Sequence, residues 1–582
     1  MANEIDLGEY LFKRLREAGA RAVHGVPGDY NLTALDYVEP AGLAWIGNCN
    51  ELNAGYAADG YGRIKGVDVI VTTFGVGELS ALNAIAGAYA ERSPVVHIVG
   101  TPARGLQQRG ARLHHSLCRG SPDDFSMFAD MCSKITLLQE NLMDAETAQE
   151  QIDRAVVACV RHQRPVYIQL PADMVDVKVS SAPLGVPLDL TMPANDAQTE
   201  HAAAEAILER IYHAKQPFIL VDAGASRFGM AAETNKLIKA TAFPTATTPF
   251  GKGIVDETVH NFHGVYGTVG DNLYVGWVKE CDLVLYIGPF ENNVNTYYFK
   301  TIPEACKTVR FDEESSQVGY ADGEPKRWSL HPKGLIQRII DQLDKRRLNQ
   351  YAEYPPLPDL RLDLKNLPQV QKTDALLQDT FWKRISEFFE PGDIIMTETG
   401  TPSTGGRDFV LPQHTTLINS GVWLSIGYML GASQGAALAQ RDLAVDGGSR
   451  NGRTILFEGD GSFQMTAQEL STIIYQRLDM IIFLINNDGY TIERLVHGKD
   501  EVYNDVAPWR YLEAPSCFGA PTDGSYNTMT ARATNWGELL DIISRDEFKY
   551  GSGLRMVEVI MDRMDAPVIL KRLLESYSAS AS

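Results

Sequence analysis

The sequence predicts an α/β protein made of three doubly wound domains, each a parallel sheet covered by helices. Its 582 residues exceed what one hydrophobic core usually holds. Short β-rich runs alternate with helical patterns along most of the chain, which is typical of parallel sheets with helical crossovers. In the last third, polar clusters directly follow two apolar runs, as expected where ligands bind beyond the strand ends of an open sheet.

The first domain is expected to span residues 1–185. It starts with DLGEYLFKRLREAG, in which Leu7, Leu11 and Leu15 recur at helical spacing. Four β-rich runs follow, namely RAVHGVPGD, DVIVTTFGVGE, PVVHIVGTP and RPVYIQLP. A polar stretch around residues 180–199 then ends the unit.

The central domain is expected at 195–348 and the third at 369–582. PFILVDAGAS, CDLVLYIGP and TVRFDEE supply the strands expected in the central domain. The Tyr- and Pro-rich segment 349–368 is typical of a linker. The third domain has strand patterns in DIIMTETG, TILFEGDG, MIIFLINND and LRMVEVIMD.

Composition excludes several classes of function. The formal net charge of −21 and the absence of a basic block predict no binding to nucleic acid. No apolar run approaches the roughly 18 residues of a membrane span, and MANEIDLGEY lacks the apolar core of a signal peptide, so we expect a cytoplasmic protein. The 7 scattered cysteines contain no CxxC pair and fit neither a disulfide framework nor a zinc site.

The two polar clusters of the third domain should meet in one crevice. The run TILFE leads to Gly459-Asp460-Gly461, and MIIFLI leads to Asn486-Asn487. The 24 residues between them, 462–485, suit a crossover helix. We expect its broad apolar face to carry Met465, Leu470, Ile473 and Ile474.

The oxygen donors of these clusters predict a site for a hard cation. The side chains of Asp460 and Asn487 and the carbonyl of Gly489 suit Mg²⁺ or Ca²⁺ better than zinc, and Mg²⁺ lets phosphates complete its octahedron. Ser462 and Thr491 add hydroxyls. Each turn alone would be structural, but the two at this spacing favour a cation that holds a diphosphate in an acidic protein.

Several motifs together resemble the thiamine diphosphate (ThDP) enzymes. GDG followed after some two dozen residues by NN is the signature of that family. The segments HGVPGDYNL, NELNAGYAADGYGR, TTFGVGELSA, LHHS, ETGT, SIGY and NNDGYTIE are similar to its pyruvate decarboxylase branch. The resemblance covers nearly the whole chain and implies pyrimidine-binding, central and diphosphate-binding domains, with ThDP and Mg²⁺ as cofactors.

The resemblance assigns the cofactor contacts. Glu51 matches the glutamate that hydrogen-bonds N1′ of the aminopyrimidine, and Ile426 matches the apolar residue that holds the cofactor bent. Leu424 occupies a position that is commonly Gly, where a backbone carbonyl accepts from the 4′-amino group. The remaining implied contacts are Thr399, Thr401, Gly461, Ser462, Thr491 and Ile492.

Four further residues match the ionisable set of the decarboxylases. Asp29, His114 and His115 are assigned to protonation and aldehyde release, and Glu493 to substrate positioning and decarboxylation. These steps need acids and bases near neutrality, which His and desolvated carboxylates provide. The His-His pair falls in a loop after a sheet strand.

The resemblance implies a carbon–carbon lyase that decarboxylates a 2-oxo acid without oxidation, pyruvate first, giving acetaldehyde and CO2 through the ThDP ylid and an enamine. In that family the two halves of each active site come from different chains. The resemblance therefore implies an obligatory homodimer and a homotetramer. Three alternatives stay open: a decarboxylase of aromatic or branched 2-oxo acids, a ThDP carboligase, and a catalytically silent structural or filament protein.

Some positions depart from the decarboxylase pattern. The loop LCRGSPDDF (117–125) is about two residues longer than usual, and Asn295, Ser403 and Val568 stand near the expected substrate pocket. These departures could admit an acid other than pyruvate. Gly224 and Ala225 occupy the place of the regulatory cysteine of some members, so we expect no cysteine-dependent activation.

Overall fold

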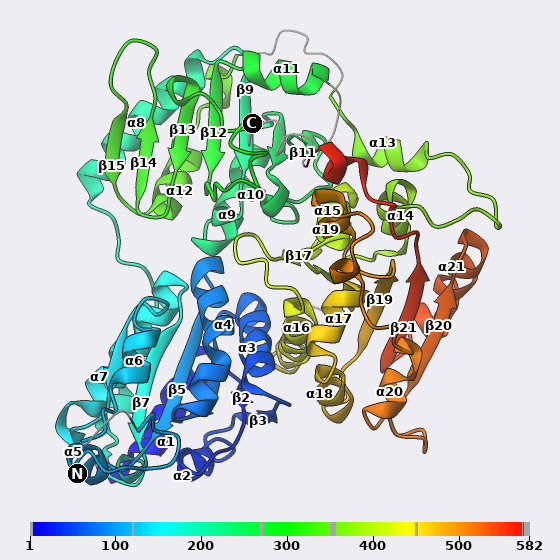
Figure 1. Ribbon diagram of the computed structural model, residues 1–582. Helices are drawn as coiled ribbons and strands as arrows, with labels where there is room; N and C mark the ends of the chain where they lie inside the picture. The colour runs from blue at the N-terminus through cyan, green and yellow to red at the C-terminus, as the bar shows by residue number, and fades with distance from the viewer. Residues whose placement is uncertain are drawn as a thin grey trace.

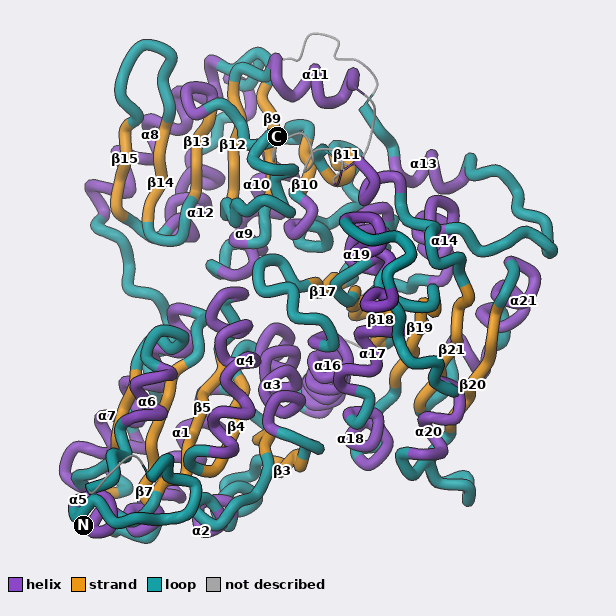
Figure 2. The backbone as a smooth tube through the Cα atoms, in the orientation of Figure 1, coloured by secondary structure: helices purple, strands orange, loops and turns teal. Residues whose placement is uncertain are grey.

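The chain folds into three α/β units, each built around its own sheet (Figure 1). The computed structural model describes residues 4–118, 122–267, 272–349, 357–447, 452–572 and 574. Figure 2 shows helices packed along the faces of the sheets. The three sheets lie within the predicted domain ranges. The predicted fold class is therefore confirmed.

The first domain holds a six-stranded parallel sheet in the order β3-β2-β4-β5-β7-β6. Its strands are β2 (Ala22–Gly25), β3 (Ala44–Gly47), β4 (Asp68–Thr73), β5 (Val95–Thr101), β6 (Gln139–Asn141) and β7 (Val166–Pro171). Its helices are α1 (Leu7–Ala18), α2 (Leu32–Leu35), α3 (Glu51–Lys65), α4 (Val76–Glu91), α5 (Arg104–Gln108), α6 (Met127–Cys132) and α7 (Ala145–His162). A short antiparallel ribbon of β1 (Glu4–Asp6) and β8 (Lys178–Ser180) joins its two ends.

The predicted pattern produces these elements for clear reasons. Leu7, Leu11 and Leu15 of α1 are fully buried, as the helical spacing requires. Every residue of β4 and β5 is buried, as expected for parallel strands covered on both faces.

The central domain is not purely parallel. Its sheet has the order β11-β10-β9-β12-β13-β14-β15, in which β14 and β15 run antiparallel to their neighbours. The turn after β13 is too short for a crossover: Asp312 N donates to Ser315 O at 2.9 Å, and the chain returns directly. The strands are β9 (Pro217–Val221), β10 (Thr245–Thr247), β11 (Phe262–Val265), β12 (Leu283–Ile287), β13 (Thr308–Phe311), β14 (Ser315–Val318) and β15 (Lys326–Ser329). The helices are α8 (Ala197–His213), α9 (Gly224–Arg227), α10 (Ala231–Thr241), α11 (Asn272–Glu280) and α12 (Pro332–Gln342).

The segment predicted as a linker, 349–368, contains a helix. Helix α13 (Leu360–Lys365) starts after Asp359, whose carboxylate accepts from the N–H groups of Arg361 and Leu362. Residues 350–356 lie outside the described part of the chain. The segment is therefore more structured than its Pro content indicates.

The third domain repeats the parallel architecture of the first, with the order β17-β16-β18-β19-β21-β20. Its strands are β16 (Ile394–Thr397), β17 (Thr416–Asn419), β18 (Thr454–Gly459), β19 (Met480–Asn486), β20 (Thr528–Ala533) and β21 (Leu554–Ile560). Its helices are α14 (Gln378–Arg384), α15 (Thr401–Gly405), α16 (Tyr428–Val445), α17 (Asp460–Thr466), α18 (Glu469–Tyr475), α19 (Thr491–Val496), α20 (Ala514–Cys517), α21 (Trp536–Ile543) and α22 (Asp546–Lys549).

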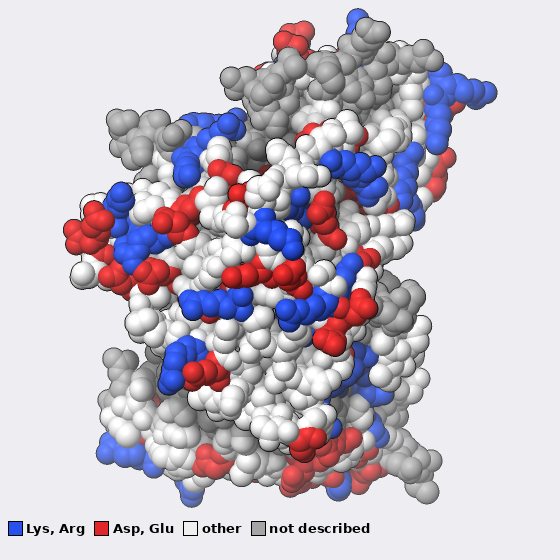
Figure 3. All heavy atoms as spheres, turned by 90° about the vertical axis from the view of Figure 1, so that its right-hand side faces the viewer, with Lys and Arg blue, Asp and Glu red and all other residues white. Residues whose placement is uncertain are grey.

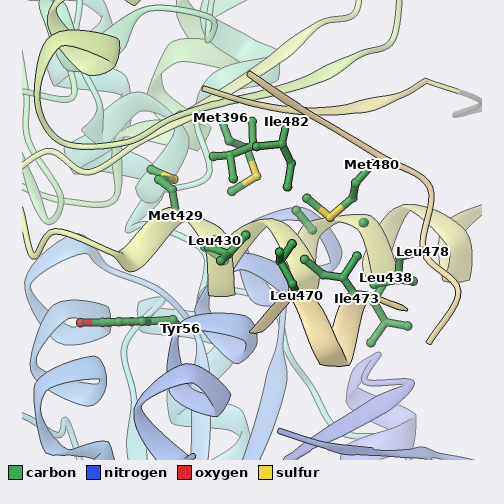
Figure 4. Close-up of a cluster of buried hydrophobic side chains, with 14 of the residues drawn as sticks. Tyr56, Met396, Met429, Leu430, Leu438, Leu470, Ile473, Leu478, Met480 and Ile482 are labelled. Atoms are coloured by element: carbon green, nitrogen blue, oxygen red, sulfur yellow. The ribbon is translucent and has the colours of Figure 1, made fainter. Parts of the chain in front are cut away.

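The crossover between β18 and β19 differs from the prediction in two ways. It forms two helices, α17 and α18, instead of one. Leu470 and Ile473 point into the buried cluster under α16 as predicted (Figure 4), but Met465 is 54% exposed, so its assignment to the apolar face was wrong. Tertiary contacts explain the break, because Thr466 Oγ1 donates to Gly427 O at 2.7 Å and Glu469 accepts from Asn48 of the first domain at 2.8 Å.

Helices α3 and α16 join the first and third domains within one chain. They lie side by side in Figure 1, and a Cβ added at Gly60 would lie 2.0 Å from the carbonyl oxygen of Ala432. Only glycine permits this approach of the two backbones. The contact fixes the carboxyl edges of the two parallel sheets relative to each other.

The surface carries mixed charge on the face shown in Figure 3, where Lys and Arg side chains are interspersed with Asp and Glu. This pattern agrees with the acidic composition and gives that face no continuous basic patch. Among the described residues, no helix combines the length and apolarity needed to cross a bilayer.

Candidate active site

A pocket lies at the carboxyl ends of β16, β18 and β19. The loop after each of these strands contributes to it, and so does the turn before α16. This is the edge where parallel sheets bind ligands. The pocket is lined by Thr399, Gly400, Thr401, Pro402, Ile426, Gly459, Asp460, Gly461, Ser462, Asn487, Gly489, Tyr490, Thr491, Ile492 and Glu493.

Three oxygen donors converge at the base of this pocket. The side-chain oxygen of Asn487 lies 3.1 Å from Asp460 Oδ1 and 3.1 Å from the carbonyl oxygen of Gly489. Neighbouring ligands of an octahedral ion with bonds of about 2.1 Å are about 3.0 Å apart. The Asn487 oxygen therefore lies at the distance of neighbouring Mg²⁺ ligands from each of the other two candidate oxygens.

The hydroxyl of Thr491 supports this orientation of the Asn487 amide. A half-turn of the amide would bring its NH2 group to the two oxygens. However, Thr491 Oγ1 donates to Arg563 O at 2.9 Å, so it can only accept from Asn487 Nδ2, which lies 2.7 Å away. The amide oxygen thus remains beside two other oxygens, an arrangement that a bound cation would stabilise.

Asp460 is held at the start of α17 by backbone donors. The N–H of Gly461 donates to Oδ1 at 2.9 Å and the N–H of Gly489 donates to Oδ2 at 3.0 Å. Burial nevertheless raises the pKa of the Asp460 carboxyl to about 6. A divalent cation at this position would favour the ionised form.

Glycines at two pocket positions are required by close contacts. A Cβ at Gly461 would lie 2.5 Å from the ring of Tyr490. Gly489 has φ +120°, and a Cβ there would lie 2.3 Å from the carbonyl oxygen of Asn504. The sequence pattern GDG…NNDG is therefore a steric requirement of this site as well as a source of ligands.

Ile426 lines the pocket, whereas Leu424 does not. Leu424 has φ +54°, in the left-handed region that favours glycine. Its N–H donates to Ser420 Oγ at 2.9 Å, and Glu91 accepts from the preceding N–H of Trp423 at 3.0 Å. These hydrogen bonds hold Leu424 in the left-handed conformation. Glycine adopts that conformation without strain, which explains why it suits the position.

Glu51, the predicted acid, lies in the first domain at the first residue of α3. The side chain of Asn50 caps the helix by accepting from Asn53 N at 2.8 Å. Burial raises the pKa of the Glu51 carboxyl. The start of α4 packs against it, since a Cβ at Gly77 would lie 3.0 Å from Glu51 Oε1.

The structure brings Asp29, His114 and His115 together at the same sheet edge. Asp29 follows β2, and the two histidines lie in the segment after β5, in a turn between α5 and α6. His114 Nε2 lies 2.5 Å from Asp29 Oδ2, and the two imidazole centroids are 4.6 Å apart. Tyr30 stacks on His114 with centroids 5.0 Å apart. This arrangement suits proton transfer between neighbouring groups.

Only one of the two groups of predicted residues lines the third-domain pocket. Glu493 is exposed in the first turn of α19 and lines the third-domain pocket. Among the described residues, none from the first domain lines that pocket. Within one chain, the candidate oxygen ligands in the third domain are therefore separate from Glu51 and the histidines in the first, and we call these two groups the half-sites.

Sequence reasoning missed a pair of buried acids beneath the pocket. Thr397 pairs with Phe457 between β16 and β18, so the next residues, Glu398 and Glu458, stand side by side on one face of the sheet. Both side chains are fully buried. Burial raises the pKa of Glu398 to about 7 and that of Glu458 well above its usual range. The motifs ETGT and TILFEGDG contain both acids, but neither pattern distinguishes a buried acid from an exposed one.

The three residues expected near the substrate pocket, Asn295, Ser403 and Val568, lie in different surroundings. Asn295 is fully buried, and its amide donates to the Asp222 carboxylate at 2.8 Å and to Phe290 O at 2.9 Å, so its assignment to the substrate pocket was wrong. Ser403 lies in α15, next to pocket-lining residues. Val568 is 43% exposed. Within the longer loop 117–125, residues 119–121 lie outside the described part of the chain.

Comparisons with known proteins match all three domains. Models of thiamine pyrophosphate enzymes match as the N-terminal TPP binding domain at residues 5–123, the central domain at 204–324 and the C-terminal TPP binding domain at 399–521. A pyruvate decarboxylase of Aspergillus parasiticus is 49% identical over 98% of this chain and 97% of its own. One from Aspergillus fumigatus is 42% identical over 99% and 97%.

A solved structure shows the same fold. The thiamine diphosphate-dependent 4-hydroxybenzoylformate decarboxylase of Rhodococcus jostii RHA1 superimposes with a TM-score of 0.75, covering 96% of this chain and 99% of its own, at 15% identity. The resemblance predicted from the motifs is thus confirmed over nearly the whole length. The chain belongs to the thiamine pyrophosphate enzymes and, within them, to the pyruvate decarboxylase family.

Proposed function

We propose that this protein decarboxylates pyruvate to acetaldehyde and CO2, using thiamine diphosphate and Mg²⁺. The observation that carries the proposal is the convergence of Asp460, Asn487 and Gly489 oxygens in a pocket at the carboxyl edge of the third sheet. A relative that is 49% identical over 98% of the chain bears the name pyruvate decarboxylase.

The third domain holds the diphosphate and its cation. The oxygens of Asp460, Asn487 and Gly489 would hold Mg²⁺ and leave positions open for phosphate oxygens. The N–H groups and hydroxyls around the pocket bind the diphosphate, which an acidic protein could not otherwise hold. We assign these contacts to Thr399, Thr401, Gly461, Ser462 and Ile492. Thr491 lines the same pocket, but its hydroxyl donates to Arg563 O and its N–H to Gly489 O, so we assign it to holding the Asn487 amide.

Glu51 and Ile426 prepare the cofactor for reaction. When bound, the cofactor would supply a carbon nucleophile that adds to the substrate carbonyl and a cationic ring that accepts the electron pair released when CO2 leaves. Glu51, whose burial favours the protonated form, exchanges a proton with the pyrimidine ring. Ile426 offers an apolar surface at the pocket wall. Leu424 lies outside the pocket lining, so only its backbone carbonyl would be available to accept from the 4′-amino group.

The remaining ionisable groups move protons and bind substrate. Decarboxylation of pyruvate to acetaldehyde consumes one proton for each CO2 released. The pair of Asp29 and His114, 2.5 Å apart, together with the adjacent His115, delivers that proton and assists release of the aldehyde. Glu493, at the rim of the other half-site, positions the substrate carboxylate for loss.

The two half-sites combine between chains in a homodimer. Each half-site carries exposed apolar side chains, with Val76 53% exposed beside Glu51, and Trp423 and Met465 42% and 54% exposed near the start of α16. Such clustered exposure is typical of a surface that another subunit covers. We further propose that two dimers form a homotetramer in the cytoplasm.

The central domain favours decarboxylation over a flavin-dependent carboligase. A nucleotide would bind an open sheet beyond β9 and β12, where the sheet order changes direction. Buried Asp222 fills this position: it accepts from Tyr286 OH at 3.0 Å and from Thr248 Oγ1 at 2.5 Å. The loops also pack closely, as Gly224 N donates to Gly288 O at 3.0 Å. These contacts support a structural role for this domain.

A preference for an aromatic or branched 2-oxo acid is the second candidate, because the loop beside the histidines is longer than the decarboxylase pattern. A silent structural protein is less compatible with a complete set of ionisable residues at two half-sites. The test is aldehyde release with ThDP and Mg²⁺ across pyruvate, branched-chain 2-oxo acids, phenylpyruvate and indolepyruvate. Acyloin as the main product, or no aldehyde from any acid, would contradict the proposal.

A single substitution tests the role of Glu51. Glu51→Gln should abolish turnover and retain ThDP uptake, because the amide preserves the shape of the carboxyl and loses its proton transfer. Uptake is measured by quenching of tryptophan fluorescence. Full activity in this variant would refute the assignment.

A further inference from the structure

We propose that Asp29, His114 and His115 also form a binding site for a borderline divalent cation, for which Zn²⁺ is the probe, and that the bound ion reversibly inhibits the protein. Each residue offers one ligand atom, and these atoms all lie within 4.8 Å of one another. The inhibition rests on the proposed function, whereas the binding does not.

The ligand set selects zinc over magnesium. Two imidazoles and one carboxylate are a common protein ligand set for zinc and leave a fourth position open. The third-domain pocket offers only oxygens, which suit Mg²⁺. The two half-sites therefore prefer different cations, and saturating Mg²⁺ leaves the histidine site free.

The geometry requires only small side-chain rotations. Ligand atoms around tetrahedral zinc are about 3.4 Å apart. His114 Nε2 and Asp29 Oδ2, now 2.5 Å apart, must separate by about 1 Å, and the other pairs, which lie within 4.8 Å, need approach by no more than about 1.4 Å. The side chains of His114 and Asp29 are 58% and 52% exposed, so both can rotate.

The surroundings favour binding through the imidazoles. His115 Nδ1 is buried without a hydrogen-bond partner among the described residues, a costly state that a bound cation would relieve. His114 Nδ1 lies 3.3 Å from Tyr30 OH. A metal-bound imidazole needs such a partner for its second nitrogen, because the hydrogen bond fixes the tautomer.

A second cluster in the described chain provides a control. His162, Glu313 and Glu314 also place ligand atoms within 4.8 Å of one another. Arg92 forms an ion pair with Glu313 there, and its guanidinium opposes a further cation. Zinc should therefore bind at Asp29, His114 and His115 first.

Occupation of the site removes its proton chemistry. A zinc-bound imidazole no longer accepts a proton at the coordinated nitrogen, and the Asp29 carboxylate is held by the ion. Neither group can then deliver the proton that aldehyde formation consumes. Inhibition should reverse on chelation, because no covalent bond forms.

The experiment is equilibrium dialysis of the full chain, saturated with ThDP and Mg²⁺, against ZnCl2. Wild type should bind one Zn²⁺ per chain at micromolar concentration. Asp29→Asn, His114→Asn and His115→Asn should each weaken binding at least about tenfold, and the control His162→Asn should bind as wild type does. Circular dichroism and ThDP uptake check that the variants fold.

Three results would overturn the inference: no binding below millimolar Zn²⁺, unchanged binding in all three site variants, or loss of binding only in His162→Asn. Dialysis measures no turnover, so a chain without decarboxylase activity can still pass or fail this test. Conversely, active protein that binds no zinc would leave the proposed function standing and remove this site.

Discussion

Two inactive variants should restore part of each other's activity when they share a dimer. Glu51→Gln disables the first-domain half-site and Asp460→Asn disables the third-domain half-site. If each active site joins halves from two chains, a dimer of the two variants has one site with both changes and one site with neither. Either homodimer has a change in both of its sites.

The expected activity follows from counting intact sites. In a random mixture of equal amounts, half of the dimers contain one chain of each variant, and half of the sites in those dimers are intact. The mixture should therefore show about a quarter of wild-type activity per chain. Both substitutions keep the size of the side chain, so the packing around Asn50 and Gly489 should persist.

The assay uses co-expressed chains with two different tags. Mass spectrometry of the intact assembly measures the fraction of mixed dimers, and a coupled assay measures acetaldehyde. Each variant alone and a co-expressed wild-type pair are the controls. Activity no greater than the sum of the two variants, in a sample that contains mixed dimers, would refute the division of the site between chains.

Three other predictions concern stability and the metal loop. Burial raises the pKa of Glu78 to about 7, so its contribution to stability is present below pH about 4.5 and is lost as the pH rises through 7. Glu78→Gln should therefore become more stable relative to wild type as the pH rises across that range. Urea unfolding at pH 5 and pH 8 should show a relative gain of at most about 3 kcal/mol. Gly489→Ala should destabilise the protein by more than about 2 kcal/mol, because the new Cβ would collide with Asn504 O. The control Gly519→Ala, also at positive φ but with nothing within 4 Å, should lower the free energy of unfolding by only about 1 kcal/mol. Equal losses in the two variants would contradict the steric argument. Arg494 donates to Asp488 O and Asn504 O at 3.3 Å, so Arg494→Met should weaken Mg²⁺-dependent ThDP uptake at least about tenfold, and exposed Arg510→Met should not.

The parts of the fold that followed from the sequence are those where one local rule determines the result. Fully apolar runs such as MIIFLI form central parallel strands because both faces of the sheet are covered. Polar clusters directly after such runs must lie at the carboxyl edge. Hence the positions of Asp460 and Asn487 at this edge could be predicted from the sequence alone.

The parts that did not follow depend on contacts between distant segments. The crossover helix breaks near Glu469, which accepts a hydrogen bond from Asn48, more than 400 residues away in the sequence. No local sequence pattern predicts that contact. From the sequence, Asn295 was expected near the substrate pocket. In the structure its amide donates to the Asp222 carboxylate in the core of the central domain. Glu458 occupies a strand pattern that would fit an apolar residue equally well, so its burial beside Glu398 could not be anticipated.

The division of the site between two domains links assembly to chemistry. If the site is divided between chains as proposed, a free chain would have the oxygens for the cation but not Glu51, because no described residue of the first domain lines that pocket. In that arrangement, such a chain would bind the cofactor weakly and would not activate it, because the pyrimidine ring would have to reach Glu51 of another copy. Dilution below the dimer dissociation constant should therefore remove activity before it unfolds either domain, and ThDP should tighten the dimer by the same factor by which dimerisation tightens ThDP binding.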